Sequence, residues 1–379
     1  MQAGTVGAVI MAGPYGATPQ EQVVGRALRA SVLDLVAVLT GAGFGPVIVA
    51  GPDLDWLPEQ ASVFRDVDAA PFYFGGRLAG LIATHDLARV VYFGAGSAPL
   101  LSRSAIGAIR AGLLEPAGER GADLPGRVVL TNNLHSSDWI GIGDAREALP
   151  VIRQAARDNS LAWMLQQSGA FDVRVLADVR PAAGMDLDTP ADLALVRKHA
   201  DCPPNLAQAL ADPLLDRIPV EPVVAVAARD EGRLAVIGRV SPLAWHALSS
   251  ASQCWIRVFS EERGMVASER IDRGEVRSLV GRMLALVGPE GFFRELGQIV
   301  DAAIIDSRVL MAASGHYPGN ADRFASDLFL ADAIADPWVR AFTGAAAEAP
   351  IPVLLGGHGV VAGGLHALAD IVAARRWAG

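Results

Sequence analysis

The stretch Gly184-Met185-Asp186-Leu187-Asp188-Thr189-Pro190-Ala191-Asp192-Leu193 decides the fold more than any other part of the chain. Asp186 and Asp188 are two residues apart, so on an extended segment both carboxylates point the same way. Thr189 and Pro190 then have the residue types of a helix N-cap and of the first helical position. Paired carboxylates at a strand end predict a site for a hard divalent cation. The alternative is a capped turn in which the acids only favour the helix N-terminus.

The composition predicts a well-packed globular protein of two domains. The chain has 379 residues, more than one hydrophobic core usually holds, and 51% of them are hydrophobic against 19% charged. The formal net charge of −9 at pH 7 argues against a nucleic-acid partner, because such a surface needs a basic stripe. Acidic metabolites remain possible partners wherever arginines cluster. Lys198 is the one lysine, so arginine supplies nearly all the positive charge.

The sequence predicts a cytoplasmic protein with no membrane partner. The first expected strand follows no basic leader, and no run approaches eighteen apolar residues. Cys202 and Cys254 are too few for a disulfide framework or a cysteine metal site. The high apolar content also makes a buried dimer surface reasonable, so a homodimer is a possible assembly.

The first 200 residues alternate short apolar runs with amphipathic segments. Strands are expected at residues 7–11, 46–50, 89–93, 127–131 and 172–176, and helices at 25–40, 75–85, 104–114, 145–158 and 161–168. Helices of this length between strands imply crossover connections, and hence an α/β fold with a three-layer, mostly parallel sheet. Ligands of such sheets bind beyond the carboxyl ends of the strands, here in loops 12–22, 94–102 and 132–143.

The composition changes between residues 201 and 222, where prolines break the pattern and predict a linker with a short helix near 206–211. Residues 1–200 are therefore expected to form one domain and residues 223–379 a second, mixed α+β domain rich in helices. The second domain is expected to contain a hairpin of strands 223–228 and 234–240 and a strand at 255–259. Helices at 276–287, 290–314 and 321–334 follow, before a strand at 352–355 and a helix at 365–375.

Several motifs in the first 200 residues occur in the order found in one superfamily. The loop Met11-Ala12-Gly13-Pro14-Tyr15-Gly16 follows the first strand, and Gly25-Arg26-Ala27-Leu28 with Val32-Leu33-Asp34 marks the next helix. Pro99-Leu100-Leu101-Ser102 follows the third strand, and the Asp-Leu-Asp-Thr-Pro stretch closes the series. With these motifs the first half resembles the MobA-like nucleotidyltransferases. The resemblance implies a glycosyltransferase-A type of α/β fold, a bound nucleotide, and Mg²⁺ held by Asp186 and Asp188.

The chain departs from that family where the phosphates would bind. The family's first loop carries an arginine and a downstream lysine, whereas residues 16–22 here contain no basic residue. Ser97 stands where the family has an aspartate that binds Mg²⁺, and a neutral hydroxyl is a far poorer ligand of that ion.

Two hypotheses follow from the match and its departures. In the first, the chain is a Mg²⁺-dependent nucleotidyltransferase acting on a small phosphorylated or anionic acceptor. In the second, it is a catalytically lapsed, nucleotidyltransferase-like protein that binds a ligand or regulates. Glycosyl transfer from a nucleotide-sugar is a third hypothesis that the fold allows.

The residues predicted to bind the nucleotide or a small anionic ligand lie at strand ends or in glycine-rich loops. They are Gly13, Tyr15, Gly16, Ser97, Asn132, Asn133, Arg257, Arg263 and His358. Backbone amides beside glycines can approach a phosphate closely, and arginine forks recognise phosphate or carboxylate groups. Each group has a structural alternative. The asparagines can satisfy a turn, arginines can form ion pairs, and the five glycines around His358 can allow close packing.

Overall fold

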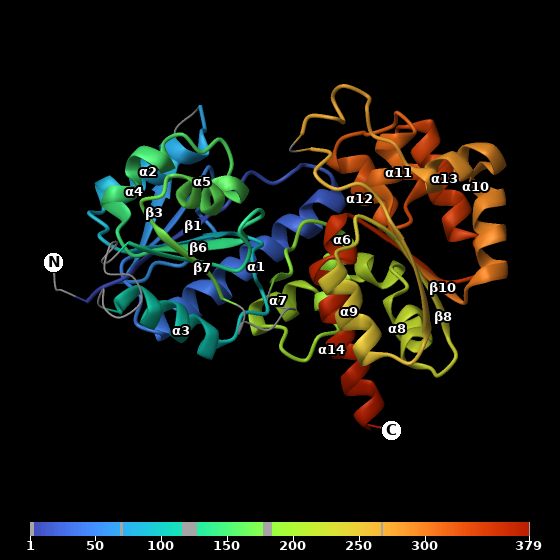
Figure 1. The fold of residues 1–379 in the computed structure, drawn as a ribbon, viewed down its shortest axis with the longest axis horizontal. Helices are drawn as coiled ribbons and strands as arrows, with labels where there is room; N and C mark the ends of the chain where they lie inside the picture. Colours follow the sequence, from blue (N-terminus) through green and yellow to red (C-terminus); the bar gives the residue numbers. More distant parts are fainter. Residues whose placement is uncertain (1–3, 69–70, 116–126, 177–183, 267, 379) are drawn as a thin grey trace. The chain divides into compact units, whose positions relative to one another are not determined.

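The fold is described from a computed structural model of the chain, which covers residues 4–68, 71–115, 127–176, 184–266 and 268–378. The chain forms two compact units. The first combines Met1–Pro14 with Leu28–Gly184, and the second combines Tyr15–Ala27 with Met185–Gly379. Helix α1 (Pro19–Gly41) therefore begins in the second unit and ends in the first. Each unit has its own sheet with helices packed on it (Figure 1).

The first unit contains a seven-stranded sheet in the order β3-β2-β1-β4-β6-β5-β7. Its strands are β1 (Gly7–Met11), β2 (Val47–Gly51), β3 (Val63–Val67), β4 (Val90–Gly94), β5 (Val128–Thr131), β6 (Trp139–Ile142) and β7 (Asp172–Val175). Its helices, besides most of α1, are α2 (Phe74–Thr84), α3 (Arg103–Leu114), α4 (Ala145–Ile152) and α5 (Leu161–Gln167). Strand β6 is antiparallel to both its neighbours, and the other strand pairs are parallel.

Helices cover both faces of this first sheet. Strand β1 shows the arrangement, because Ala8 and Ile10 pack in an apolar cluster with α1 and α3. Val9 and Met11, which alternate with them, pack in a second cluster with α2, α4 and α5. None of these four side chains is more than 9% exposed. The three-layer, mostly parallel α/β fold expected of this half is confirmed.

Two strands of the first sheet escape the sequence pattern. Strand β3 is an edge strand whose residues are half-buried or exposed, so it lacks the apolar run of a buried parallel strand. Strand β6 lies within residues 132–143, which are expected to be a loop, and all four of its residues are buried. The insertion of β6 between β4 and β5 makes this part of the sheet mixed.

The second unit contains a four-stranded sheet in the order β11-β10-β8-β9, and all its pairs are parallel. Its strands are β8 (Arg233–Gly238), β9 (Trp255–Ser260), β10 (Ala302–Asp306) and β11 (Val353–Gly356). Its helices are α6 (Pro190–Val196), α7 (Pro204–Ala209), α8 (Val220–Ala228), α9 (Pro242–Ala251), α10 (Leu279–Ile299), α11 (Ser307–Ala313), α12 (Asn320–Asp327), α13 (Pro337–Ala347) and α14 (Gly363–Ala378).

The second sheet is also enclosed by helices. Ala303 and Ile305 of β10 pack in one apolar cluster with α10, α11 and α13. Helix α8 packs against β8, β10 and β11, and α14 packs against α8 and α9. The second half is therefore an α/β unit with a parallel sheet, rich in helices as expected.

The expected hairpin in the second half is wrong. Residues 223–228 lie in helix α8, and β8 pairs with β9 and β10 instead. Valine-rich segments favour strands by propensity, but packing against the sheet outweighs that preference here. The helix expected at 290–314 is also corrected, because α10 ends at Ile299 and the buried strand β10 precedes α11.

The division of the chain differs from the expected one. The first unit ends at Gly184, so the stretch from Met185 onward belongs to the second unit. There α6 contacts β11, α14 and the 3-10 helix η5 (His358–Val361). Residues 201–222, expected to be a linker, contain α7 and the 3-10 helix η3 (Pro213–Arg217). This segment is therefore structured within the second unit.

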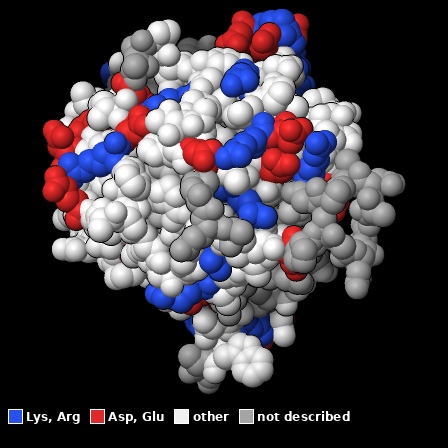
Figure 2. Space-filling model, turned by 90° about the vertical axis from the view of Figure 1, so that its left-hand side faces the viewer, with Lys and Arg blue, Asp and Glu red and all other residues white. Residues whose placement is uncertain are grey.

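The surface and the helices give two further observations. The face in Figure 2 shows basic and acidic side chains interspersed, with no continuous basic stripe. Within the described ranges, none of the helices combines the length and apolar character that a bilayer crossing requires.

Candidate functional site

The first sheet has its topological switch point between β1 and β4, because the chain continues from β1 towards β2 on one side and reaches β4 on the other. Met11 is the register partner of Gly94, so the loops that follow both strands start side by side. Gly13 is exposed in the first of these loops, and Ser97 is half-buried in the second. The structure thus places two of the predicted residues at the edge where ligands of such sheets bind.

Ser97 belongs to a tight turn. Its backbone N–H donates to the Gly94 carbonyl at 3.1 Å, and Ala98 next to it has a φ of +52°. A non-glycine residue in the left-handed region is uncommon and costs conformational energy. The turn therefore holds Ser97 in a defined position near the end of β4.

A capping box closes the loop after β1 where the family carries its cations. Thr18 Oγ1 and N–H donate to Glu21 Oε2 at 2.7 and 3.1 Å. The Glu21 carboxylate lies directly against Gly16, so any Cβ at that position would collide with it. The ring of Tyr15 packs on Gly25, where a Cβ would be 2.9 Å from Tyr15 Cδ1. Of the predicted residues in this loop, Gly16 therefore borders the Glu21 carboxylate, and Tyr15 makes an apolar packing contact with Gly25.

Asn132 and Asn133 stabilise the connection from β5 to β6. Asn133 Oδ1 accepts from the backbone N–H groups of His135 and Ser136 at 3.0 and 3.3 Å, which is an Asx turn. Asn132 Oδ1 accepts from Asp138 N at 3.1 Å, and its amide donates to the Asp138 carboxylate. Both asparagine side chains therefore satisfy the backbone of the turn, which is the structural alternative to ligand binding. Asn132 is half-buried at the carboxyl end of β5.

The decisive stretch alternates buried apolar residues with more exposed acidic ones. Met185 and Leu187 are 0% and 1% exposed, while Asp186 between them is half-buried and Asp188 is exposed. This alternation is what an extended segment requires, and it agrees with two carboxylates that point the same way. Such a pair fits Mg²⁺, which proteins often hold by one or two carboxylates together with waters and phosphates. No group of three or more His, Cys, Asp or Glu residues suited to a metal occurs among the described residues.

The second half of the same stretch forms a buried capping box. Thr189 Oγ1 and N–H each donate to Asp192 Oδ2 at 2.8 Å, and the Asp192 N–H points back to Thr189 Oγ1 at 3.4 Å. Asp192 is 0% exposed. Burial holds the pKa of its carboxyl well above the usual range, and the charge of Asp188 adds to the rise. The expected N-cap and Pro190 at the helix start are confirmed.

Helix α6 and the glycine-rich loop after β11 pack on each other. A Cβ at Gly357 would lie 2.9 Å from Thr189 Cγ2, and one at Gly356 would lie 2.9 Å from Ala191 Cβ. A Cβ at Gly359 would collide with the Asp192 carboxylate. These three glycines therefore serve close packing, which was the structural alternative for this loop.

The four strands of the second sheet end in register. Gly238 of β8 pairs with Ser260 of β9, Asp306 of β10 pairs with Gly356 of β11, and the preceding residues Ile237 and Ile305 are partners. The loops that follow these strands consequently start along one edge. Arg263 lies three residues beyond the end of β9, and His358 lies two residues beyond the end of β11. Arg257 does not reach this edge, because it is the third residue of β9.

A buried ion pair that the sequence analysis missed forms the centre of this edge. Arg239 Nε and Nη2 donate to Asp306 Oδ2 and Oδ1 at 2.6 and 3.0 Å. Asp306 is fully buried, and the Arg239 side chain is 12% exposed. Gly238 has a φ of +135°, and a Cβ there would collide with Asp306 Cβ. The close approach of β8 to Asp306 thus requires glycine.

His358 is half-buried beside this pair. Burial, together with the positive charges of Arg239 and Arg263, lowers its pKa to about 4, and the charge of Asp306 opposes the shift. The imidazole is consequently neutral at pH 7. Its Nδ1 is buried and has no hydrogen-bond partner within the described part of the chain.

A second buried ion pair lies next to the first. Arg308 donates to Asp327 through Nη1 and Nη2 at 2.7 and 2.6 Å, and both side chains are at most 4% exposed. Arg308 Nη1 also donates to Ser307 Oγ at 2.9 Å. Arg323 lies over the Tyr317 ring at 4.6 Å and donates to Asn320. Arg308 is therefore fully engaged in an ion pair within the second unit.

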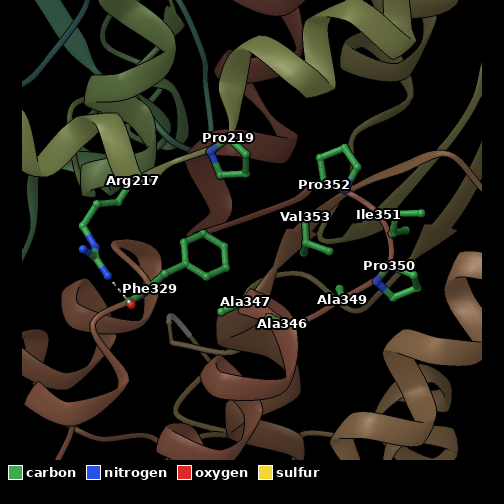
Figure 3. Close-up of a pocket in the computed structure, with 10 residues that line it drawn as sticks. All are labelled: Arg217, Pro219, Phe329, Ala346, Ala347, Ala349, Pro350, Ile351, Pro352 and Val353. Atoms are coloured by element: carbon green, nitrogen blue, oxygen red, sulfur yellow. Dashed lines mark hydrogen bonds between the residues drawn. The ribbon is translucent and has the colours of Figure 1, made fainter.

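A pocket of about 570 Å³ lies at the opposite end of the second sheet, where β11 begins (Figure 3). Its walls are mostly apolar, and Arg217 is the charged residue among them. Arg217 Nε and Nη2 donate to the carbonyls of Leu328 and Phe329 at 2.9 and 3.2 Å. The guanidinium therefore serves the backbone around Phe329, and the lining offers no acid or base.

Comparisons with known proteins give matches to solved structures at low identity. No family model matches the chain, and no match was found among curated proteins. Three solved structures match about half of it. The bifunctional IspDF from Campylobacter jejuni is 9% identical over 50% of this chain and 53% of its own, with a TM-score of 0.36. CMP:2-keto-3-deoxy-manno-octonic acid synthetase in complex with CTP is 15% identical over 51% and 97%, with a TM-score of 0.36. A cytidylyltransferase from Leptospira borgpetersenii serovar Hardjo-bovis is 14% identical over 55% and 94%, with a TM-score of 0.37.

This chain spans about half the length of the Campylobacter protein. At these identities and TM-scores the likeness transfers no site residue to this chain.

Proposed function

We propose that the chain is a ligand-binding protein of nucleotidyltransferase-like fold that binds a nucleotide without transferring a nucleotidyl group. The ligand would contact the loops that follow β1 and β4, where Gly13 and Ser97 lie.

Ser97, which a tight turn holds at the end of β4, carries the proposal. A triphosphate in transfer accumulates negative charge that cations or amides must meet. Ser97 offers a neutral hydroxyl, which is a poor ligand of Mg²⁺, and residues 16–22 of the sequence contain no cation. The contacts of a base and ribose carry no charge and need no cation.

A calorimetric series of cytidine, CMP and CTP, with the guanine and adenine counterparts, tests this proposal. Affinity is expected to fall from nucleoside to triphosphate, with no gain from Mg²⁺. Ser97→Ala is expected to weaken the binding of the nucleoside and of the triphosphate by a similar factor. Ser250→Ala, at an exposed serine of α9, serves as the matched control. Triphosphate binding that tightens with Mg²⁺ in the unaltered protein would overturn the proposal.

A second candidate is a Mg²⁺-dependent nucleotidyltransferase with a small phosphorylated or anionic acceptor. The observation that favours it is the pair of Asp186 and Asp188, half-buried and exposed, which alternates with the buried Met185 and Leu187. These two carboxylates would hold Mg²⁺, which when bound neutralises phosphate charge. Pyrophosphate release with a panel of phosphorylated acceptors would support this candidate if Asp186→Asn abolished it.

A homodimer, a cytoplasmic location and the absence of a nucleic-acid partner stay predictions. Sedimentation velocity checks the first, and a filter-binding assay with DNA and RNA checks the last.

A further inference from the structure

The pocket where β11 begins has the size and the walls of a small-molecule site. Its volume of about 570 Å³ lies within the range of about 300–1,000 Å³ that ligand pockets span. Three alanines at or just after the end of α13 leave the space open, and three prolines with a fixed φ stiffen its walls. These residues are Ala346, Ala347, Ala349, Pro219, Pro350 and Pro352. Walls that are already formed lower the cost of ordering on binding.

Phe329, which also lines this pocket, occupies a backbone position that glycine usually fills. The Phe329 N–H donates to the Ser326 carbonyl at 3.1 Å. The Leu330 N–H donates to the Ala325 carbonyl at 2.8 Å. These two bonds form a Schellman motif at the end of α12, in which Phe329 has a φ of +55°. An aromatic residue in the left-handed region costs conformational energy, and such strain gathers at ligand sites. The chain accepts that cost where Phe329 supplies the aromatic ring of the pocket (Figure 3).

Arg217 brings one positive charge to the pocket. Its Nε and Nη2 each donate to a backbone carbonyl at the end of α12, at 2.9 and 3.2 Å, and its other N–H groups remain for a ligand. Asp216 beside it pairs with Arg197 at 2.9 Å, and in the described part of the chain Arg217 has no carboxylate partner. Glu348 is exposed and is not one of the lining residues. The guanidinium is therefore held in place by backbone carbonyls while no carboxylate neutralises its charge.

One guanidinium among otherwise uncharged walls matches one negative charge. A carboxylate carries that charge and has the planar geometry that a guanidinium fork binds. A phosphate monoester carries about 1.5 to 2 negative charges at pH 7, so part of its charge would stay unmatched. We propose that this pocket binds a small carboxylate with an apolar, ring-sized body, its head on Arg217 and its body against Phe329 and the prolines. The site lies wholly within the second unit and goes beyond the nucleotide site proposed for the loops after β1 and β4.

Saturation-transfer NMR titrations of the full chain with three probes test the proposal. Benzoate has the head and the body, benzamide replaces the charged head by a neutral one of the same shape, and acetate lacks the body. Benzoate is expected to bind with a Kd of about 1 mM. Benzamide and acetate should each bind at least about tenfold more weakly, because the first loses the charge-assisted bond and the second loses the apolar contact. Equal affinities for benzoate and benzamide, or no benzoate binding at about 20 mM, would overturn the proposal.

Two pairs of variants place the binding in this pocket. Ala347→Trp, at an exposed lining position, fills the space and should abolish benzoate binding, while Ala341→Trp, exposed elsewhere on α13, should leave it unchanged. Arg217→Gln should make the affinities for benzoate and benzamide equal. Arg340→Gln is its control, because Arg340 Nε and Nη2 also donate to a backbone carbonyl, that of Ile334, at 2.9 and 2.7 Å outside the pocket. Benzoate binding that survives Ala347→Trp, or an unchanged ratio of the two affinities in Arg217→Gln, would show the proposal to be wrong and would leave the nucleotide site untouched.

Discussion

Arg308→Met tests whether the second unit depends on a buried ion pair. The guanidinium donates to both Asp327 oxygens at 2.7 and 2.6 Å, and the two side chains are 4% and 0% exposed. Removing it leaves the Asp327 carboxylate in a place that water does not reach. An uncompensated buried charge of this kind costs about 3–5 kcal/mol. We expect that loss in the free energy of unfolding of the second unit at about pH 8.

The pH dependence of the loss separates a buried charge from lost packing. Burial raises the pKa of Asp327 to about 6, and the charge of Arg308 is the largest influence that opposes the rise. Without Arg308 the folded state takes up a proton at a higher pH than the unfolded state does. Stability is then regained as the pH falls and lost as it rises, so the cost should shrink towards about pH 5. A cost of packing alone would stay constant.

The double variant Arg308→Met, Asp327→Leu completes the cycle. Replacing both members of a buried pair by apolar groups is often close to neutral, so most of the loss should be recovered. Arg294→Met is the control, because Arg294 makes an exposed pair with Glu295 and should cost less than about 0.5 kcal/mol. Hydrogen exchange of peptides from β10 and α12 reports on the second unit separately. Additive costs in the double variant would refute the reasoning.

Three further predictions follow from other contacts of the second unit. Gly238→Ala should lower the free energy of unfolding by more than about 2 kcal/mol, because Gly238 has a φ of +135° and a Cβ there would collide with Asp306. Gly344→Ala, inside α13 where a Cβ meets open space, should instead raise the free energy of unfolding by about 0.5–1 kcal/mol. Thermal unfolding compares the two. Thr189→Val removes the hydroxyl of a buried cap and should lower stability by about 1–2 kcal/mol in urea unfolding, so an unchanged midpoint would contradict it. Since the pKa of His358 is lowered to about 4, its contribution to stability is present above pH 6.5 and is lost as the pH falls to about 4. The loss is at most about 3 kcal/mol, and His358→Gln should remove this part of the pH profile.

The buried parallel strands of both sheets could be predicted because each reads as an apolar run between breaks. Strands β1 and β11 are examples, with every residue buried in both. Strand β10 escaped because Ala302–Asp306 follows α10 closely and runs straight into α11, with no turn residue to mark it. A continuous apolar run between two helices is compatible with one long helix as well as with a buried strand.

The site was only partly predictable for a related reason. Gly13, Ser97, Arg263 and His358 follow strands that the pattern revealed, so their place at a sheet edge could be anticipated. The pair of Arg239 and Asp306 could not, because Asp306 ends the strand that was missed. The sequence does place an acidic residue, Asp306, directly after the apolar run Ala302–Ile305. That position indicates a residue at a sheet edge only if the run is recognised as a strand.

The decisive stretch shows how one short segment can serve two purposes. Thr189 and Asp192 form a cap whose atoms are buried against Gly357 and Gly359, so this half is needed for the packing of the second unit. Asp186 is half-buried and Asp188 is exposed in the half before it, where they alternate with the buried Met185 and Leu187. The motif can therefore keep its sequence for structural reasons even where the chemistry of the first loop has changed. For this reason the neutral Ser97 after β4 says more about nucleotidyl transfer than the Asp-Leu-Asp pair does.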